Sequence, residues 1–216
     1  GSQAPAYTSI VASGANACVL HYVENDRRMQ DGELLLIDAG CELDGYASDI
    51  TRTFPVSGRF SGPQKAVYEL VLAAQAAAIA EIRPGASWNA GHDAAVRVLA
   101  QGFIDLGLLA GSLDGVLETG SYRQFYMHRT GHWLGLDVHD AGDYKLAGEW
   151  RPLVAGNVLT VEPGCYIRPA DGVPEAFWNI GIRIEDDALV TPDGCEILTT
   201  AAPKSVADIE ALMADR

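Results

Sequence analysis

Cysteine is scarce in this 216-residue chain, and its cysteines form no Cys-x-x-Cys pair. The four are Cys18, Cys41, Cys165 and Cys195. Their wide spacing excludes a zinc knuckle and a dense disulfide framework. We therefore expect all four to be structural side chains, and we expect the protein to reside in the reducing cytoplasm.

Long apolar runs and basic surfaces are also missing. The longest apolar stretch, residues 71–80, is too short to span a membrane and is interrupted by Gln75. Acidic residues outnumber basic ones by 29 to 15, which gives a net charge of −14. Because an acidic protein gains nothing from counterion release, we expect it to bind neither nucleic acid nor a membrane.

The length and the 48% hydrophobic content are enough to bury one core, so we expect a single domain over residues 1–216. Hydrophobic periodicity, caps and turn residues predict strands at 34–38 and 46–54, helices at 61–82, 87–107 and 113–119, strands at 157–161, 165–168 and 180–190, and a helix at 205–213. Strands followed by helices and then strands predict an α+β fold with helices on one side of a sheet.

A short pattern occurs twice in the chain. Residues 36–41 (LIDAGC) and 160–165 (TVEPGC) each place an acid at the end of an apolar strand, shortly before Gly-Cys. Each acid is followed by a second one in a β-prone stretch, which gives four acids: Asp38, Asp49, Glu162 and Glu185. We therefore expect two related hairpins whose carboxylates face a shared centre, with chance similarity over six residues as the alternative.

Asp38 and Asp49 flank a turn signal at Asp44-Gly45, so the hairpin brings them nearly opposite each other on neighbouring strands. Two such carboxylates in apolar sequence are destabilising unless a cation or a proton neutralises them. A metal ion resolves this conflict, although a single acid taken alone is more often solvated.

Glu162 and Glu185 also lie in apolar strand sequence, where an unpaired glutamate carries a large desolvation cost. Four acids of this kind argue against ordinary solvated side chains. For Glu185 alone, an ion pair with Arg183 on the same strand face is a competing interpretation.

Three histidines crowd into residues 127–140, and only two lie elsewhere. The crowded ones are His128, His132 and His139; the others are His21 and His92. One imidazole added to four carboxylates makes an oxygen-rich ligand set that favours Mn²⁺ or Co²⁺ over a thiolate-type zinc site. A single histidine is more often structural than a ligand, and this interpretation is retained for His92.

Four segments, IDAGCELDGYASDITRTFP, MHRTGHWLGLDVHDAG, LTVEPGCYI and GIRIEDDALVT, resemble in this order the signature segments of aminopeptidase P within the M24 peptidase family. The resemblance extends from about Tyr7 to the C-terminus and implies a pita-bread fold with two halves related by a pseudo-twofold axis. It also implies a hydrolase with two metal ions that releases the first residue from peptides with proline in second place. A prolidase specific for Xaa-Pro dipeptides and a non-catalytic pita-bread binding module are the alternatives.

By this resemblance, five residues are metal ligands: Asp38, Asp49, His132, Glu162 and Glu185. They would hold two divalent ions, with Mn²⁺ as the first candidate and Co²⁺ or Zn²⁺ as alternatives. Glu162 is the expected general base, and His128 and His139 would bind substrate and stabilise the tetrahedral intermediate. His21 and Arg183 would form the pocket around proline. Residues 129–131 depart from the small and apolar residues usual there, which we do not expect to abolish metal binding.

The resembled family has an N-terminal domain and early catalytic-domain helices that this sequence does not contain. We therefore expect a C-terminal catalytic domain whose fold is incomplete at its N-terminus. Loss of those helices would expose part of the sheet, so we expect a poorly stable monomer that a second copy or a missing N-terminal fragment completes. The expected binding partners are proline-containing peptides.

Overall fold

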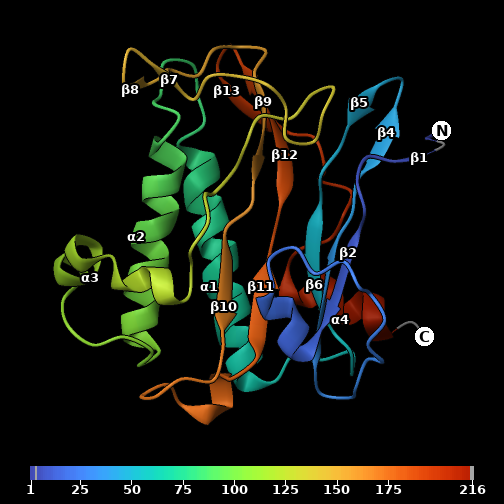
Figure 1. The fold of residues 1–216 in the computed structure, drawn as a ribbon, viewed down its shortest axis with the longest axis vertical. Coiled ribbons are helices and arrows are strands. Elements are labelled where there is room, and N and C mark those ends of the chain that lie inside the picture. The colour runs from blue at the N-terminus through green and yellow to red at the C-terminus, as the bar shows by residue number, and fades with distance from the viewer. Residues whose placement is uncertain (3, 215–216) are drawn as a thin grey trace.

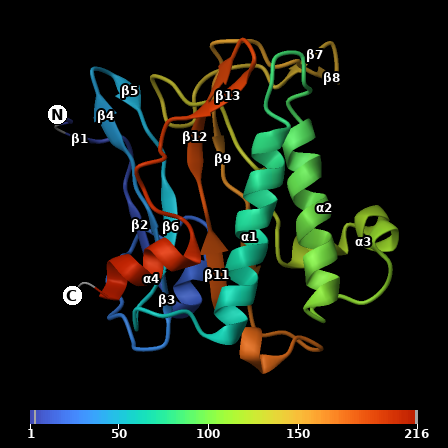
Figure 2. The same cartoon turned by 180° about the vertical axis from the view of Figure 1, so that it is seen from behind.

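The computed structural model describes residues 1–2 and 4–214. Its helices are α1 (Gly62–Ala80), α2 (Ala90–Asp105), α3 (Leu113–Thr119) and α4 (Val206–Ala214), with 3₁₀ turns η1 (Gly14–Cys18), η2 (Ser121–Gln124) and η3 (Glu175–Phe177). Helices α1 and α2 lie side by side along the strands, and α4 lies on the same side as α1 (Figures 1 and 2). The predicted helices are thus confirmed, and they cover one side of the strands as expected.

The strands are β1 (Ala4–Pro5), β2 (Ile10–Ser13), β3 (Leu34–Asp38), β4 (Cys41–Leu43), β5 (Tyr46–Ala47), β6 (Thr51–Pro55), β7 (Lys145–Leu146), β8 (Glu149–Trp150), β9 (Val158–Val161), β10 (Gly164–Ile167), β11 (Ile180–Arg183), β12 (Asp186–Thr191) and β13 (Gly194–Ile197). Their sheets have the orders β1-β4-β5, β2-β3-β6, β13-β12-β9, β10-β11 and β7-β8. All of these pairings are antiparallel. The short strands β1, β2, β4, β7, β8 and β13 were not predicted from the sequence.

The start of α1 follows its sequence signals closely. Ser61 accepts the backbone N–H of Gln64, whose side chain accepts the Ser61 N–H in return, so two of the unpaired N–H groups are satisfied. Helix α2 begins at Ala90 rather than at Ser87, because backbone hydrogen bonds join residues 85–88 to residues 151–153. This pairing with a distant segment carries no local sequence signal.

Two predicted strands are each divided in the structure. The segment 46–54 forms β5, which pairs with β4, and β6, which pairs with β3. The segment 180–190 forms β11, which pairs with β10, and β12, which pairs with β9. The prediction of continuous strands was therefore wrong, because each hairpin changes its hydrogen-bonding partners where its acids lie.

The first division requires a glycine. A Cβ atom at Gly40 would lie 1.7 Å from the carbonyl oxygen of Ser48, so only glycine fits where the two strands of this hairpin separate. The turn between β4 and β5 has positive φ values at Asp44 (53°) and Gly45 (87°), as a two-residue hairpin turn demands.

The two broken hairpins lie edge to edge. The Glu185 N–H donates to the carbonyl oxygen of Thr51 at 3.0 Å, and the Asp49 N–H donates to Asp187 Oδ2 at 3.2 Å. The acids at both divisions are thereby brought to one place, as the repeated sequence pattern predicts.

Gln75 interrupts the apolar stretch of α1 for a structural reason. Its Nε2 donates to the carbonyl oxygens of Val161 and Ile184, which end strands at the division of the second hairpin. A buried carbonyl that leaves its ladder needs another donor, and this side chain supplies it. The other buried side chains of α1 and α2 are apolar or aromatic except for Gln64 at the start of α1, and Val71 and Phe103 are fully buried.

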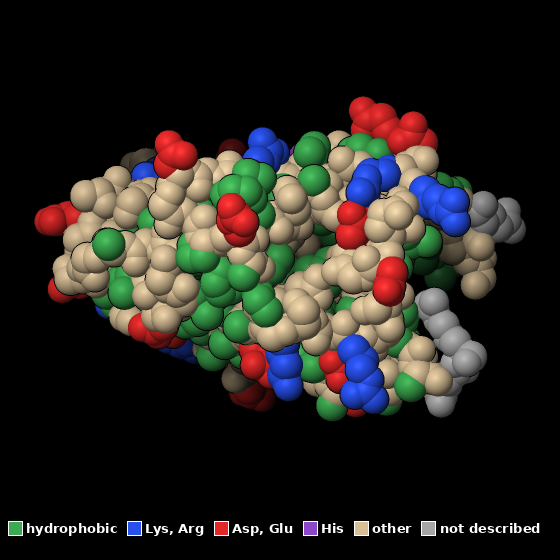
Figure 3. Space-filling model, turned by 90° about the horizontal axis from the view of Figure 1, so that it is seen from below, with side chains coloured by type: hydrophobic (Ala, Val, Ile, Leu, Met, Phe, Trp, Pro, Cys, Tyr) green, Lys and Arg blue, Asp and Glu red, His purple; other side chains and the backbone are tan. Residues whose placement is uncertain are grey.

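In the described part of the chain, no helix is both long and apolar enough to cross a membrane. On the face seen from below, Lys and Arg side chains are dispersed among acidic and apolar ones (Figure 3).

Candidate metal centre

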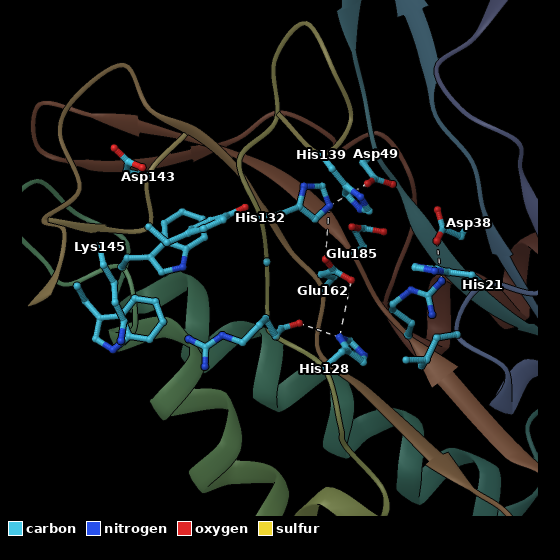
Figure 4. A pocket seen from close by; sticks show the side chains of 17 residues that line it. His21, Asp38, Asp49, His128, His132, His139, Asp143, Lys145, Glu162 and Glu185 are labelled. Carbon is cyan, nitrogen blue, oxygen red and sulfur yellow. Dashed lines mark hydrogen bonds and ion pairs between the residues drawn. The ribbon is translucent and has the colours of Figure 1, made fainter. Parts of the chain in front are cut away.

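The hairpin divisions open into a cavity of about 810 Å³. Every predicted site residue lines it: His21, Asp38, Asp49, His128, His132, His139, Glu162, Arg183 and Glu185. Figure 4 shows Asp38, Asp49, Glu162 and Glu185 from the two hairpins converging there with His128, His132 and His139 from one loop, and with His21. The candidate site therefore draws on segments from across the whole chain.

Asp49, His132 and Glu185 form the tightest group in this cavity. One ligand atom from each lies within 4.8 Å of the other two, an arrangement that could hold a metal ion. His132 Nε2 also lies 3.3 Å from Asp49 Oδ2 and 3.5 Å from Glu162 Oε1. The Nδ1 atom of His132 lies 2.9 Å from the Trp133 carbonyl oxygen. Because a carbonyl only accepts, Nδ1 carries the proton and Nε2 is left as a metal ligand.

The loop before Trp133 is fixed by pairing with β9. The Thr160 N–H donates to the His132 carbonyl, and the Glu162 N–H donates to the Thr130 carbonyl at 2.8 Å. A Cβ atom at Gly131 would lie 2.0 Å from the Thr160 carbonyl oxygen, so the close approach needs glycine. This backbone pairing holds the His132 imidazole beside the Glu162 carboxylate.

The carboxylates repel one another in a buried site. Burial, with the charges of the neighbouring acids, raises the pKa of Glu162 to about 7 and that of Glu185 well above its ordinary range. Burial also raises the pKa of Asp38, although Arg183 opposes the shift. At Asp49 the effect of burial is outweighed by the nearby His132 imidazole and by the hydrogen bond from the Tyr7 hydroxyl, so its pKa is lowered.

This donor set fits a divalent cation. At the metal-side end of the cavity, four carboxylates lie around one guanidinium, that of Arg183, whose Nη2 lies 2.6 Å from Asp38 Oδ2. Excess negative charge on hard oxygen donors, joined by a single imidazole, is the ligand chemistry of Mn²⁺ and similar ions.

Tyr7 was not identified as a site residue from the sequence. Its hydroxyl lies 2.5 Å from Asp38 Oδ1 and 2.5 Å from Asp49 Oδ1, which ties the two acids together. The only sequence signal was that the family resemblance begins at this residue. The hydroxyl has one proton for two carboxylates, so it orients them without cancelling their charge.

We expect Tyr7→Phe to weaken metal binding by about 10- to 100-fold, because a group that orients ligands contributes about that much to affinity. Titration calorimetry with Mn²⁺ measures this loss. Tyr22→Phe is the matched control, since Tyr22 is also partly buried but does not line the cavity, and its hydroxyl donates to Asp26 instead. Equal affinities of the Tyr7→Phe variant and the unmodified protein would contradict the assignment.

His128 and His139 lie on the cavity wall in different settings. His128 Nδ1 lies 2.7 Å from the Arg129 carbonyl, and its Nε2 lies 2.8 Å from the Tyr166 hydroxyl. Burial lowers the pKa of His128 to about 3, so its ring is neutral. His139 makes no hydrogen bond to the described residues; its ring lies edge-on to His132, with centroids 4.4 Å apart.

Arg183 makes more hydrogen bonds within the site than the sequence suggested. Besides Asp38, its guanidinium donates to the Tyr166 hydroxyl at 3.0 Å and to Thr51 Oγ1 at 3.2 Å. These contacts favour a role in positioning Asp38, and its predicted place in the proline pocket stays a prediction. The competing Arg183 pair with Glu185 is not formed, because Glu185 accepts from Thr51 Oγ1 at 2.6 Å instead.

The remaining candidates behave as structural residues. His92 does not line the cavity, and its Nδ1 bonds Thr130 Oγ1 at 2.8 Å. The four cysteines are free thiols.

Comparison with known proteins bears on this site. Residues 1–192 match the profile of metallopeptidase family M24. The chain is 57% identical to the Xaa-Pro aminopeptidase of Haemophilus influenzae over 97% of its own length and 48% of that protein. It therefore spans about half the length of such curated relatives.

Solved structures agree with this similarity. The aminopeptidase PepP of Pseudomonas aeruginosa superimposes with a TM-score of 0.98 at 59% identity, covering 100% of this chain and 49% of that one. Escherichia coli aminopeptidase P, solved with the inhibitor Pro-Leu, superimposes with a TM-score of 0.96 at 48% identity, covering 100% and 49%. The predicted pita-bread fold is confirmed.

Proposed function

Since the chain belongs to metallopeptidase family M24, we propose that it carries the metal centre of an Xaa-Pro aminopeptidase, which releases the first residue from peptides with proline in second place. The observation that carries this proposal is the convergence of four carboxylates and one imidazole in a single cavity of a chain so similar to such enzymes. None of the predicted ligands is replaced, which argues against a non-catalytic binding module.

We propose two divalent ions, with Mn²⁺ as the first candidate. The residues that would hold them are Asp38, Asp49, His132, Glu162 and Glu185, with Asp49 and Glu185 serving both ions. When bound, such ions polarise a carbonyl oxygen and lower the pKa of water, which makes hydroxide available near neutral pH.

The side chains around this centre have separable tasks. Glu162, beside His132 and facing the cavity, is placed to accept the proton of the attacking water. His139 has no hydrogen-bond partner among the described residues, so it is free to donate to the oxygen that gains negative charge in the transition state. His128 is neutral and engaged at both ring nitrogens, so its proposed part is to line the substrate site in a fixed orientation.

Recognition of proline must depend on shape. A bond before proline has no N–H for the enzyme to hold, so the ring itself and nearby carbonyls must be recognised. His21 and His139 form a wall for such a ring, with their own ring centroids 6.5 Å apart.

The test is cleavage of Ala-Pro-Ala by the Mn²⁺-loaded protein, with Ala-Ala-Ala as the control peptide. We expect release of the first alanine from the proline peptide alone, and loss of this activity when a chelator removes the metal. Cleavage of the dipeptide Ala-Pro with no cleavage of the tripeptide would assign a prolidase instead. An inert, metal-free protein would favour a binding module.

We also propose that the protein acts in the cytoplasm, as a homo-oligomer or in association with an N-terminal fragment. The support is a group of exposed apolar side chains on and after the edge strand β2: Val11, Val19, Val23 and Met29. Exposed apolar side chains on and beside an edge strand favour a neighbouring protein surface. Light scattering coupled to size exclusion would measure the assembly.

A further inference from the structure

The cavity continues beyond the candidate metal centre to a second end with different chemistry. This end, which we name the distal wall, is formed by Trp88, Arg129, Tyr144, Lys145 and Trp150. Figure 4 places Lys145 and Asp143 at this end, on the far side of His132 and Glu162 from His21 and Asp38. The acids of the proposed centre and the cations of the distal wall thus share one continuous cavity.

Two cations contact one aromatic ring in the distal wall. Lys145 Nζ lies 4.4 Å from the ring centroid of Trp150, and Arg129 Cζ lies 4.9 Å from it. Arg129 Nη2 also donates to Asn89 Oδ1, which holds the guanidinium in place. Contact with an aromatic ring stabilises a cation without neutralising its charge.

Neither cation is paired with an acid. The ion pairs among the described residues include neither Arg129 nor Lys145. Asp143 is exposed at the same end, and the Asp93 carboxylate, which does not line the cavity, lies near enough to Arg129 to interact with its charge, but neither acid forms an ion pair with Arg129 or Lys145. In a chain with 29 acids and 15 bases, two unpaired cations on one cavity wall leave a local positive charge that an anion can use.

The distal wall is built on a fixed base. Trp88 packs against Trp133 and Tyr144 with ring centroids 4.0 and 4.9 Å apart. Strands β7 and β8 pair Lys145 directly with Trp150. Aromatic packing and strand pairing therefore hold the cations in position before any ligand arrives, which lowers the entropic cost of binding.

We propose that Arg129 and Lys145 bind a carboxylate of the substrate on the C-terminal side of the cleaved bond. The proposal rests on the proposed function, because an enzyme that releases one residue leaves only the C-terminal part of the peptide long enough to reach a second end of the cavity. The positive charge of the distal wall attracts a carboxylate and repels the free amino group of the peptide. The peptide is therefore oriented with its C-terminal part towards the distal wall. The volume of about 810 Å³ lies towards the upper end of the roughly 300–1,000 Å³ typical of small-ligand sites, which suits a peptide longer than two residues.

The carboxylate has two possible sources, the free C-terminus of a short peptide or an acidic side chain after proline. The first is tested with Ala-Pro-Ala against Ala-Pro-Ala-amide, and the second with Ala-Pro-Glu-Ala-amide against Ala-Pro-Gln-Ala-amide. We expect the Mn²⁺-loaded protein to prefer the charged member of at least one pair by about 10-fold in kcat/KM, mainly through KM.

The variants are Arg129→Gln, Lys145→Gln and the double variant. We expect each single variant to reduce the ratio of kcat/KM between the charged and the uncharged peptide, and the double variant to bring this ratio to about 1. The kcat/KM for the uncharged peptides should stay within about 2-fold of that of the unmodified protein. Arg123→Gln is the matched control, because Arg123 is exposed, lies 5.2 Å from the Tyr122 ring centroid and does not line the cavity. The proposal would be overturned if the variants lost kcat/KM equally for charged and uncharged peptides, or if the unmodified protein showed no preference for the charged peptides.

A binding measurement separates this proposal from the proposed function. Quenching of tryptophan fluorescence by Pro-Ala and by Pro-Ala-amide needs no cleavage. Tighter binding of Pro-Ala that is lost in the double variant would support the distal wall even if no peptide is cleaved, in which case only the proposed function fails. Cleavage of proline peptides with equal binding of the two dipeptides would reject the first source of the carboxylate, and the Glu and Gln peptides then decide the second.

Discussion

Asp49→Asn is expected to abolish metal binding at the proposed centre and to reduce cleavage of Ala-Pro-Ala by more than about 100-fold. Groups that merely orient ligands contribute about 10- to 100-fold, and Asp49 is proposed to bind both ions directly. The substitution keeps the shape of the side chain but removes its charge, so Tyr7 and His132 retain a neighbour of the same size. Mass-spectrometric metal analysis and a peptide assay on the same preparation measure both effects.

His139→Ala is the companion variant for Asp49→Asn. His139 is proposed to contact substrate but not metal, so this variant should retain its metal while turnover slows. Unchanged metal content in Asp49→Asn would count against Asp49 as a ligand.

Asp186→Ala is expected to lower the free energy of unfolding by about 3–5 kcal/mol, the usual effect of removing one partner of a buried ion pair. Asp186 is fully buried, and its Oδ1 lies 2.7 Å from Nη2 of Arg52, which is also buried. Its Oδ2 accepts from Lys204 Nζ at 2.6 Å and from Gln75 Nε2 at 3.0 Å. Removing this carboxylate leaves the Arg52 charge buried without its partner. Urea unfolding at pH 7 measures the change.

The pH dependence gives a second check on Asp186. Burial raises its pKa, but Arg52 and the hydrogen bonds to its oxygens outweigh burial and hold the pKa below the ordinary value. A lowered pKa means that the stabilisation is present at neutral pH and is lost as the pH falls below about 4. The difference in the free energy of unfolding between the unmodified protein and Asp186→Ala should therefore become smaller in acid.

Glu196→Ala is the control for Asp186→Ala, since Glu196 is exposed on the neighbouring strand β13 and forms no ion pair with the described residues. It should change the free energy of unfolding by less than about 0.5 kcal/mol. A loss of under about 1 kcal/mol in Asp186→Ala would mean that the pair with Arg52 is not required for the fold.

The sequence predicted the acids of the site because their chemistry conflicts with their surroundings. Asp38 and Asp49 lie in apolar sequence around a recognisable turn, and the structure brings them within reach of one hydroxyl group. The start of α1 could also be predicted, because its capping residues are close neighbours in the sequence. Features that depend on neighbours in the chain can be inferred without coordinates.

What the sequence did not predict depends on distant contacts. Gln75 seemed only to interrupt an apolar stretch, because the carbonyls it satisfies belong to strands more than eighty residues away. Tyr7 has no local pattern that marks it as a partner of two acids. The division of each long strand likewise follows from a change of pairing partner, which strand propensity does not encode.

The central claim is that four carboxylates and His132 hold two divalent ions in this cavity. The most direct measurement is anomalous X-ray scattering from crystals of the protein as isolated, combined with metal analysis of the same sample. We predict two peaks that share Asp49 and Glu185 as ligands, and two equivalents of metal per chain. A single peak, peaks away from these residues, or a metal-free protein that fails to take up Mn²⁺ would contradict the claim.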